Sequence, residues 1–291
     1  MKIKPMLAEK SIPFDDEDWI FEIKWDGMRA VVTVENEKIC KLESRPSDAH
    51  PEGQDITRRF PELIGTHVKA KQGIIDGEIV SLNENGIPKF KLLQPRISLQ
   101  NDSKIALASK VKPCNLAVFD VMELNDESLI ALPLIERKYF LESITSKDDG
   151  LIPSMYVQGK GKAFFDSVVG MGYEGIMAKK INSKYLPGKR SDLWQKEKPR
   201  HKAICEVTGY NLGEGWRQRM GALLISEQGV DRGKVGSGLM DKDIDKLLSI
   251  LQPIGRNNGT VLVMPTTLIE VSYFERTEAG HFRFPAFKKI V

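Results

Sequence analysis

The chain has 291 residues, of which 41% are hydrophobic and 29% charged, and its formal net charge is +3. This is an ordinary soluble composition, and no apolar run approaches the ~18 residues that a membrane-spanning helix needs. The three cysteines lie far apart and form no CxxC pair, so neither a zinc site nor a disulfide framework is expected.

The length predicts about two domains, at one domain per ~100–200 residues. The N-terminal segment has no apolar core of the signal-peptide kind, so we expect a reduced, cytoplasmic protein with no membrane partner. The small net charge neither demands nor excludes a nucleic-acid partner, because the distribution of charges matters more than their sum.

The first two thirds of the chain combine strands with short helices. Period-two alternation or β-branched composition predicts strands at 19–24, 29–35, 73–82, 115–123 and 173–180. Helical spacing predicts helices near 55–64, 135–145 and 160–171. Hairpin-like spacings favour an α+β domain with antiparallel sheets over a doubly wound sheet, and we place this domain at residues 1–199.

The pattern changes after "KEKPRHKA" at 196–203, where short strands and glycine turns begin. "ICEVTGYNLGEGW" and "MGALLISEQGVDRGKVGSG" look like hairpins. One helix is predicted near 241–251 with Asp241 as its N-cap, and the strands "TVLVMP" and "LIEVSYFERT" follow. About five strands and one helix in ~90 residues outline an all-β OB-fold barrel, at residues 200–291, with a hinge near 199–202.

Charged residues recur at the ends of the predicted strands. Residues two apart in a strand share a face, so three pairs point the same way: Glu22 with Lys24, Asp76 with Glu78, and Lys196 with Lys198. Apolar neighbours would partly desolvate these charges, and unpaired buried charges are costly. For any single strand two interpretations stay open: structural ion pairs, or a shared pocket for a polyanion and a metal.

Seven segments, taken in order, resemble the motifs of the covalent nucleotidyltransferases, the superfamily of DNA ligases, RNA ligases and mRNA capping enzymes. They are "KWDGMR" at 24–29, "SR" at 44–45, "DGEIV" at 76–80, "FDV" at 119–121, "EGIMAKK" at 174–180, "RSDLWQKEK" at 190–198 and "RFPAFKK" at 283–289. The first resembles the KxDGxR nucleophile motif. A lone KxDG would be weak, but six further elements in order make chance similarity very improbable.

Within the superfamily, the chain is most similar to compact bacterial and phage ATP-dependent DNA ligases, above all to the ligase module of bacterial end-joining proteins. "GYNLGEGWRQRMGALLI", "KVGSGL" and "ERTEAGHFRFPAF" carry this likeness in the predicted barrel. Few residues precede Lys24, and the zinc cysteines of NAD-dependent ligases are missing. The resemblance therefore implies ATP as the donor of AMP.

The resemblance implies that Lys24 attacks the α-phosphorus of ATP and becomes lysyl-AMP. An amine must be neutral to attack, and a free lysine has a pKa near ~10.4. Burial, a metal ion and neighbouring cations favour the neutral form, and the candidate cations are Arg29, Lys179, Lys196 and Lys198. The implied later steps transfer AMP to the 5′-phosphate of a nick in duplex DNA and seal the strand by attack of the 3′-hydroxyl.

The resemblance also implies where the nucleoside binds. Glu22 is expected at the adenine edge and Phe119 stacked on the adenine ring. Arg45 is expected to hold the ribose or the 5′-phosphate, and Glu78 the ribose or a metal. Taken alone, Phe119 would be a core residue and Glu78 equally well part of a structural ion pair, so only the constellation supports these roles.

The remaining motif residues are expected to meet phosphates and metal. The expected phosphate contacts are Arg29, Arg190, Lys196 and Lys198, and Arg283 is expected to orient the pyrophosphate. Glu174, with Glu78, is expected to hold Mg²⁺ (or Mn²⁺), which takes a few carboxylates plus phosphate oxygens and waters. Taken alone, Arg190 and Arg283 would be solvated surface charges, and Trp194 is interpreted as packing.

Further basic residues are candidates for contacts to DNA phosphates: Arg217 and Arg219 in "GWRQRMG", and Lys160 and Lys162 beside Gly161. For each of them an ordinary solvated charge is an equally good explanation.

The last motif departs from the family pattern. Lys288 and Lys289 stand where arginines are common, and the sequence ends at "KKIV", which predicts a less efficient first step. No segment suggests a separate DNA-encircling domain, so we expect a weak grip on DNA, or help from a DNA-end-binding or clamp protein. We otherwise expect a monomer that works at the nucleoid in replication, repair or recombination.

Two alternatives stay open. One is another enzyme of the superfamily, an RNA ligase or a GTP-using capping enzyme, against which the end-joining-like barrel argues. The other is a relative that binds nucleic acid without catalysis, against which the intact set of Lys24, Glu78 and Glu174 argues.

Overall fold

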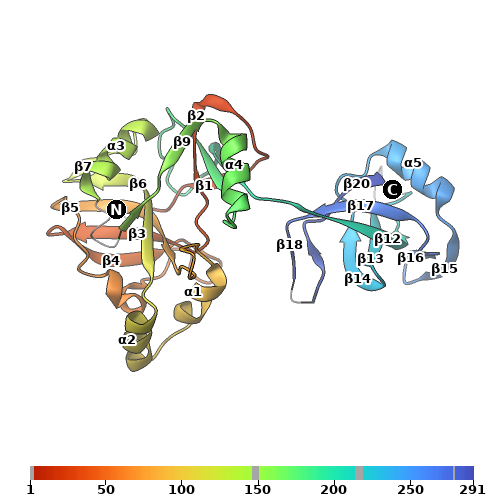
Figure 1. Cartoon of the computed structure of the whole chain (residues 1–291), viewed down its shortest axis with the longest axis horizontal. Helices are drawn as coiled ribbons and strands as arrows, with labels where there is room; N and C mark the ends of the chain where they lie inside the picture. The colour runs from red at the N-terminus through yellow and green to blue at the C-terminus, as the bar shows by residue number, and fades with distance from the viewer. Residues whose placement is uncertain (1–2, 146–150, 214–218, 278) are drawn as a thin grey trace. The chain divides into compact units, whose positions relative to one another are not determined.

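The structure is a computed structural model that describes residues 3–145, 151–213, 219–277 and 279–291. The chain folds as two compact units, Met1–Lys198 and Pro199–Val291, and each encloses a hydrophobic core of its own (Figure 1). Within the described ranges, no helix is both long and apolar enough to cross a membrane.

The first unit is built on two sheets. A five-stranded sheet has the order β1 (Leu7–Lys10), β11 (Arg190–Glu197), β10 (Ile176–Lys180), β2 (Asp16–Ile23) and β9 (Tyr156–Gly159). A six-stranded sheet has the order β4 (Lys38–Ser44), β3 (Met28–Glu35), β5 (Gln72–Val80), β6 (Asn115–Leu124) and β7 (Glu127–Ser128), with β8 (Leu151–Pro153) beside β6. Among the described strands of this unit only β1–β11 and β6–β8 pair in parallel, as expected for an α+β domain.

The described residues of this unit form four α-helices: α1 (Phe90–Ile97), α2 (Asp102–Val111), α3 (Leu134–Ile144) and α4 (Gly161–Gly170). Helix α3 packs on β6, and α2 packs on the segment Pro61–Leu63. Helix α4 packs on β2, β9 and β10 (Figure 1) over an apolar cluster that includes Phe21, Val168 and Ile176. A separate aromatic cluster contains Phe119, Tyr185 and Trp194. Since Phe119 belongs to the six-stranded sheet and Trp194 to the five-stranded one, this cluster joins the two sheets.

The prediction of an α-helix near 55–64 is wrong. The segment forms two single 3₁₀ turns, Thr57–Arg59 and Pro61–Leu63, around Phe60. Pro61 lacks a backbone N–H and restricts the residue before it, so an α-helix cannot run through this point. Helices α1 and α2 were not predicted, and α1 carries Pro95 inside it, which obscures its helical pattern.

In its described residues, the second unit forms a small β-barrel with one helix. Its elements are β12 (His201–Asn211), β13 (Ala222–Glu227), β14 (Val230–Val235), α5 (Asp241–Ile250), β15 (Pro253–Asn257), β16 (Thr260–Val263), β17 (Leu268–Tyr273), β18 (Glu275–Arg276), β19 (Phe282–Arg283) and β20 (Ala286–Ile290). Pairing runs β14–β13–β12–β17–β20. A bridge between Ser237 and Ala286 returns from β20 to the segment after β14, which confirms the predicted OB-fold.

Two predicted hairpins and one predicted helix cap lie in the barrel. "ICEVTGYN" is part of one long strand, β12, which pairs antiparallel with β13 from Ala222 on; the end of the first predicted hairpin, at 214–216, lies outside the described residues. The second hairpin is confirmed, with Gln228 and Gly229 at positive φ in the turn between β13 and β14. Asp241 is the first helical residue and Met240 the N-cap, whose N–H donates to Asp243.

A buried ion pair anchors α3 to the six-stranded sheet. Arg137 and Asp120 are both fully buried, and the guanidinium donates from Nε to Oδ1 at 2.8 Å and from Nη2 to Oδ2 at 2.9 Å. Its Nη1 also donates to the carbonyl oxygens of Leu132 and Ser183. Arg137 therefore ties α3 to β6 and to the segment that follows β10.

We expect Arg137→Met to lower the free energy of unfolding by about 3–5 kcal/mol, because the change leaves the Asp120 carboxylate buried without its counter-ion. Urea unfolding followed by circular dichroism measures the loss. The matched control is Arg58→Met, which removes the exposed pair between Arg58 and Asp102 and should cause no resolvable change. Equal effects of the two substitutions would contradict an anchoring role for Arg137.

Candidate active site

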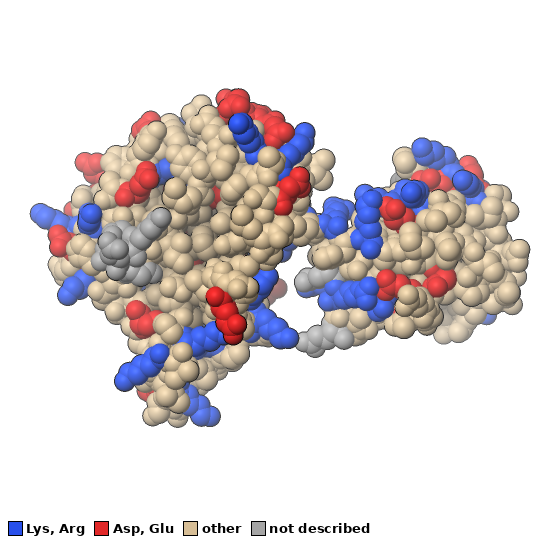
Figure 2. Space-filling view, in the orientation of Figure 1, with Lys and Arg blue, Asp and Glu red and all other residues tan. Residues whose placement is uncertain are grey.

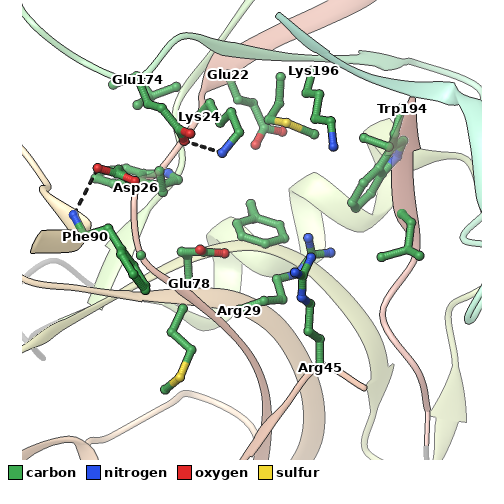
Figure 3. Close-up of a pocket in the computed structure, with 18 of the residues that line it drawn as sticks. Glu22, Lys24, Asp26, Arg29, Arg45, Glu78, Phe90, Glu174, Trp194 and Lys196 are labelled. Atoms are coloured by element: carbon green, nitrogen blue, oxygen red, sulfur yellow. Dashed lines mark hydrogen bonds and ion pairs between the residues drawn. The ribbon is translucent and has the colours of Figure 1, made fainter. Parts of the chain in front are cut away.

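A cavity of about 520 Å³ lies between the two sheets of the first unit. Figure 3 shows Glu22, Lys24, Glu174 and Lys196 along one wall and Glu78, Arg29 and Arg45 along the facing wall. Its lining contains nine of the predicted site residues: Glu22, Lys24, Arg29, Arg45, Glu78, Phe119, Glu174, Arg190 and Lys196. Residues far apart in sequence thus meet in one place.

Lys24 follows β2 and points into the cavity beside Glu174 (Figure 3). Its ammonium group forms an ion pair with the Glu174 carboxylate, which also pairs with Lys198. Lys24 and Glu174 each expose 20% of their side chains, so water reaches them only in part. The Lys24 backbone N–H donates to the Gly175 carbonyl oxygen at 2.9 Å. This hydrogen bond continues the pairing of β2 with β10 beyond the ends of both strands.

The Asp-Gly pair after Lys24 has a structural role. Asp26 accepts a hydrogen bond from the backbone N–H of Phe90, the first residue of α1, at 2.9 Å (Figure 3). A carboxylate at a helix N-terminus satisfies a free N–H and interacts favourably with the helix dipole. A Cβ at Gly27 would lie 2.1 Å from the Ile79 carbonyl oxygen, so no other residue fits there without a backbone shift.

Glu78 faces Lys24 from β5. Burial raises the pKa of its carboxyl group to about 7; the neighbouring charges of Arg29 and Lys24 oppose the rise, and those of Asp76 and Glu174 add to it. Glu78 and Glu174 therefore lie close enough to interact electrostatically. A divalent cation between them would favour the ionised form of both groups.

The acidic groups fit a magnesium ion that is only partly ligated by protein. In the described ranges no three or more His, Cys, Asp or Glu side chains cluster closely enough to form a complete metal cage. Mg²⁺ usually takes one or two protein carboxylates together with substrate phosphates and waters. Glu78 and Glu174, on facing walls of the cavity, provide such a pair.

Arg29 is held in place by Asp76, a partner to which the sequence analysis gave no role. Its Nε and Nη2 donate to the two Asp76 oxygens at 2.5 and 2.6 Å. Asp76 also accepts a hydrogen bond from the Tyr185 hydroxyl at 2.6 Å. The guanidinium carbon lies 4.6 Å from the centre of the Phe119 ring. In the sequence, Asp76 shares a strand face with Glu78, and this pattern could have indicated that Asp76 pairs with Arg29.

The inner end of the cavity combines aromatic rings with a buried charge cluster. The Lys179 ammonium donates to Glu22 at 3.0 Å and lies 4.2 Å from the Trp194 ring centre and 4.5 Å from that of Phe119. Burial lowers the pKa of Lys179 to about 8, with Lys138 adding to the fall and Glu22 opposing it. Trp194 is thus part of the cavity wall as well as of the core.

The outer rim is basic. Arg45 and Arg190 are exposed, and Lys196 is half-buried. Burial lowers the pKa of Lys196, and the charges of Arg190, Lys24 and Lys198 act in the same direction. Lys24, Arg190, Lys196 and Lys198 are therefore close in space, as the order of the motifs predicted. Arg283 belongs to β19 in the second unit.

The predicted DNA contacts outside the cavity are not singled out by the structure. Arg217 lies outside the described residues, Arg219 pairs with Asp245 at 2.5 Å, and Lys162 lies 3.7 Å from Asp15. On the face drawn in Figure 2, lysines and arginines are interspersed with acidic residues in both units. The cavity, rather than these surface charges, is therefore the feature that indicates a function.

A partly buried lysine lies beside two carboxylates, with basic side chains around it and aromatic rings at the inner end of the cavity. These are the residue types expected of a nucleotide-transferring enzyme. The family model described as "ATP dependent DNA ligase domain" matches residues 5–198. The chain belongs to the ATP-dependent DNA ligase family, and the resemblance found in the sequence is confirmed.

Known relatives agree with this assignment. The chain is 29% identical, over 98% of its length, to the multifunctional non-homologous end joining protein LigD of Mycolicibacterium smegmatis. It is also 29% identical, over 97% of its length, to a DNA ligase of Thermococcus onnurineus. It spans 38% and 53% of these two proteins. The crystal structure of the ligase domain of M. tuberculosis LigD matches with a TM-score of 0.58 and 25% identity, covering 99% of this chain and 95% of that one.

Glu197 is a buried carboxyl group that has no counter-ion in the described part of the chain. It lies on β11 between Lys196 and Lys198, but is the cross-strand partner of Ile176 and so faces the apolar cluster under α4. It is fully buried, and neither of its oxygens has a hydrogen-bond partner among the described residues. Burial raises its pKa from 4.5 to about 7.

This shift has a consequence for the pH dependence of stability. Because the folded-state pKa is raised, the stabilising contribution of neutral Glu197 is complete below pH 4.5 and is lost as the pH rises to about 7. We expect Glu197→Gln, which stays neutral, to melt at a higher temperature than the wild type at pH 8, with the difference vanishing near pH 4.5. Differential scanning fluorimetry across this range measures it.

The matched control is Glu142→Gln on the exposed face of α3, which should follow the wild-type curve at every pH. If Glu197→Gln also runs parallel to the wild type, Glu197 is ionised and paired in the folded protein, and the assignment of a neutral carboxyl group is wrong.

Proposed function

We propose that this protein is an ATP-dependent DNA ligase that seals nicks in duplex DNA through a lysyl-AMP intermediate. The observation that carries the proposal is the position of Lys24 in a cavity with two carboxylates and several cations, in a chain of this family. The cavity volume of about 520 Å³ lies in the usual range for small-molecule sites.

Lys24 is the proposed nucleophile. In the first step its Nζ forms a bond to the α-phosphorus of ATP, the bond from that phosphorus to the bridging oxygen breaks, and pyrophosphate leaves with the electron pair. The ammonium must first release a proton to solvent, which reaches the Lys24 side chain because 20% of it is exposed, once the ion pair with Glu174 opens. The phosphate charge is met by the cations of the rim, Lys196, Lys198 and Arg190, which act by alignment and electrostatic stabilisation.

Glu174 and Glu78 are the proposed ligands of a divalent cation, Mg²⁺ or Mn²⁺. When bound, such an ion neutralises charge on the phosphate oxygens and withdraws density from phosphorus. Glu174 would exchange Lys24 for the ion, which frees the amine for attack. Arg29, fixed by Asp76, and Arg45 are proposed to contact nucleotide or nick phosphate and ribose.

The adenine is proposed to bind at the inner end of the cavity, where Glu22 lies beside Phe119 and Trp194. Phe119 is buried, with the Arg29 and Lys179 cations 4.6 and 4.5 Å from its ring centre. An aromatic ring in this position supplies a flat apolar wall for a base. The role predicted for Arg283 in the second unit stays a prediction.

The second and third steps transfer AMP to a 5′-phosphate and expel it by attack of a 3′-hydroxyl. The OB-fold of the second unit belongs to a class that binds nucleic acids, which supports nicked duplex DNA as the substrate. The end-joining name of the LigD relative supports a role in DNA repair, with a DNA-end-binding protein as a partner.

We expect Lys24→Met to abolish covalent labelling of the protein by ATP, because no other amine replaces the nucleophile. Mass spectrometry of the intact protein detects the added AMP, and peptide mapping should place it on Lys24. Melting temperature should change little, since the Lys24 side chain is partly exposed.

Labelling that persists on Lys24→Met, or that maps to Lys179 or Lys196, would refute the assignment. The same wild-type assay with GTP, followed by sealing of nicked DNA and nicked RNA, separates a DNA ligase from the capping-type and RNA-ligase alternatives. A wild type that takes no label at all would indicate the non-catalytic alternative.

Glu174→Gln tests the metal proposal. The amide keeps the shape but removes the charge, so we expect self-labelling to fall by roughly a hundredfold or more, because metal-ion stabilisation of transition-state charge is worth several kcal/mol. Single-turnover labelling at increasing Mg²⁺ measures the loss and any rise in the metal concentration required. Glu84→Gln at an exposed site is the control. A large fall in melting temperature with normal labelling per folded molecule would mean that Glu174 is structural.

A further inference from the structure

The segment from 181 to 189 lies between two of the motifs and carries none of the predicted site residues. Within it, Tyr185 is 2% exposed, and its ring packs edge-on against Trp194 with 5.7 Å between the ring centres. Its hydroxyl group donates to Asp76 Oδ2 at 2.6 Å and accepts a hydrogen bond from the Met6 backbone N–H at 2.9 Å. Because a backbone N–H can only donate, the hydroxyl proton must point to the Asp76 carboxylate.

Asp76 needs more than one donor because another carboxylate lies beside it. Asp76 and Asp120 are both fully buried, and they are cross-strand partners on β5 and β6. Like charges directly opposite each other destabilise a sheet unless each one is compensated. Asp120 is compensated by Arg137. Asp76 is compensated by Arg29, and the Tyr185 hydroxyl adds a further donor to the same Oδ2 atom that Arg29 uses.

The Arg29 guanidinium keeps one nitrogen available at the cavity. Its Nε and Nη2 donate to Asp76, and Nη2 also donates to the Met6 carbonyl oxygen at 3.4 Å. Within the described ranges Nη1 has no hydrogen-bond partner, and Arg29 lines the cavity. Nη1 is therefore the part of the guanidinium that a bound anion can reach, and the pairing with Asp76 decides where it points.

Tyr185 is itself fixed from two sides. Arg137 Nη1 donates to the carbonyl oxygen of Ser183 at 2.9 Å, and its guanidinium carbon lies 5.8 Å from the centre of the Tyr185 ring. The Tyr185 backbone N–H donates to the Ile130 carbonyl oxygen at 2.9 Å. The hydroxyl group therefore cannot follow the Asp76 carboxylate if that group rotates, and so it opposes the rotation.

We propose that Tyr185 is a positioning residue that acts through Asp76 to hold the Arg29 guanidinium with Nη1 directed to a phosphate oxygen in the cavity. The inference rests on the proposed function, in which Arg29 contacts phosphate. Without the hydroxyl donor the carboxylate gains freedom to rotate, and the guanidinium paired with it turns as well. Tyr185 does not line the cavity, so its effect on the reaction passes through this pair.

The test compares Tyr185→Phe with Arg29→Lys in two reactions: single-turnover labelling of Lys24 by ATP, and sealing of a nick that already carries AMP on its 5′-phosphate. Tyr185→Phe removes only the hydroxyl group, whereas Arg29→Lys keeps the charge but loses the fork that pairs with Asp76. We expect Tyr185→Phe to slow, by roughly tenfold per folded molecule, the same reaction or reactions that Arg29→Lys slows. The double variant should be no slower than Arg29→Lys alone, because the fork is already gone.

The matched control is Thr145→Val, which also removes one buried hydroxyl group, here a donor to the Leu141 carbonyl oxygen at 2.7 Å. It should lower the melting temperature, as Tyr185→Phe should, but leave both rates per folded molecule unchanged. Unchanged rates in Tyr185→Phe, a different pattern from Arg29→Lys, or a further loss in the double variant would overturn the inference while the proposed function stands. A wild type that takes no label from ATP would overturn both.

Proton exchange of the guanidinium reports its position without an activity assay, and the wild type alone provides a test if Tyr185→Phe does not fold. In the wild type, NMR should show the Arg29 Nε–H, which donates to Asp76 at 2.5 Å, exchanging with water as slowly as the Nε–H of the fully buried Arg137. In folded Tyr185→Phe the exchange of Arg29 should be roughly tenfold faster. Fast exchange in the wild type, or equal rates in the two proteins, would contradict the positioning role.

Discussion

The first unit depends on one constraint: a charge placed between its two sheets must have an opposite charge beside it. Desolvation of an unpaired ion costs several kcal/mol even after relaxation. Arg29 therefore has Asp76, Lys179 and Lys138 share Glu22, and Lys24 and Lys198 share Glu174. These pairs join neighbouring strands within each sheet, and one of them ties helix α3 to the five-stranded sheet, so the same charges that line or support the cavity also hold its walls in place.

The sequence predicted which distant residues meet in one cavity better than it predicted the local structure. Motif order brought Lys24, Glu78 and Glu174 together correctly, because chemistry at phosphorus restricts both residue type and spacing. Alternation also placed most long strands. The 3₁₀ turns at 57–63 and helix α1 were missed or wrong, because prolines at 61 and 95 obscure the periodicity on which prediction depends. Long-range partners such as Tyr185 and Lys138 leave no local pattern, so only the fold shows them.

The motif residues divide into two kinds once the structure is known. Lys24, Glu78 and Glu174 face the cavity, whereas Asp26 and Gly27 position the chain around it by capping α1 and by approaching Ile79 closely. Gly175 has a φ of 140°, and a Cβ there would lie 2.0 Å from the Glu197 carbonyl oxygen. The spacing of the motifs therefore reflects backbone geometry as much as chemistry, which explains why a short pattern such as KxDG is informative only in context.

The charge pairing also explains how nucleotide can enter without creating new unpaired ions. The cavity is lined by more basic than acidic side chains, and several cations lie near Lys196, whose pKa is lowered first by burial and then by these neighbouring charges. Under the proposed function, a triphosphate would supply the missing negative charge, and the lysines would exchange carboxylate partners for phosphate oxygens. Binding would then release Lys24 from Glu174 at the same place where the phosphate charge arrives. In that proposal the ion pair of the free protein stands in for the substrate and holds the amine where attack would occur.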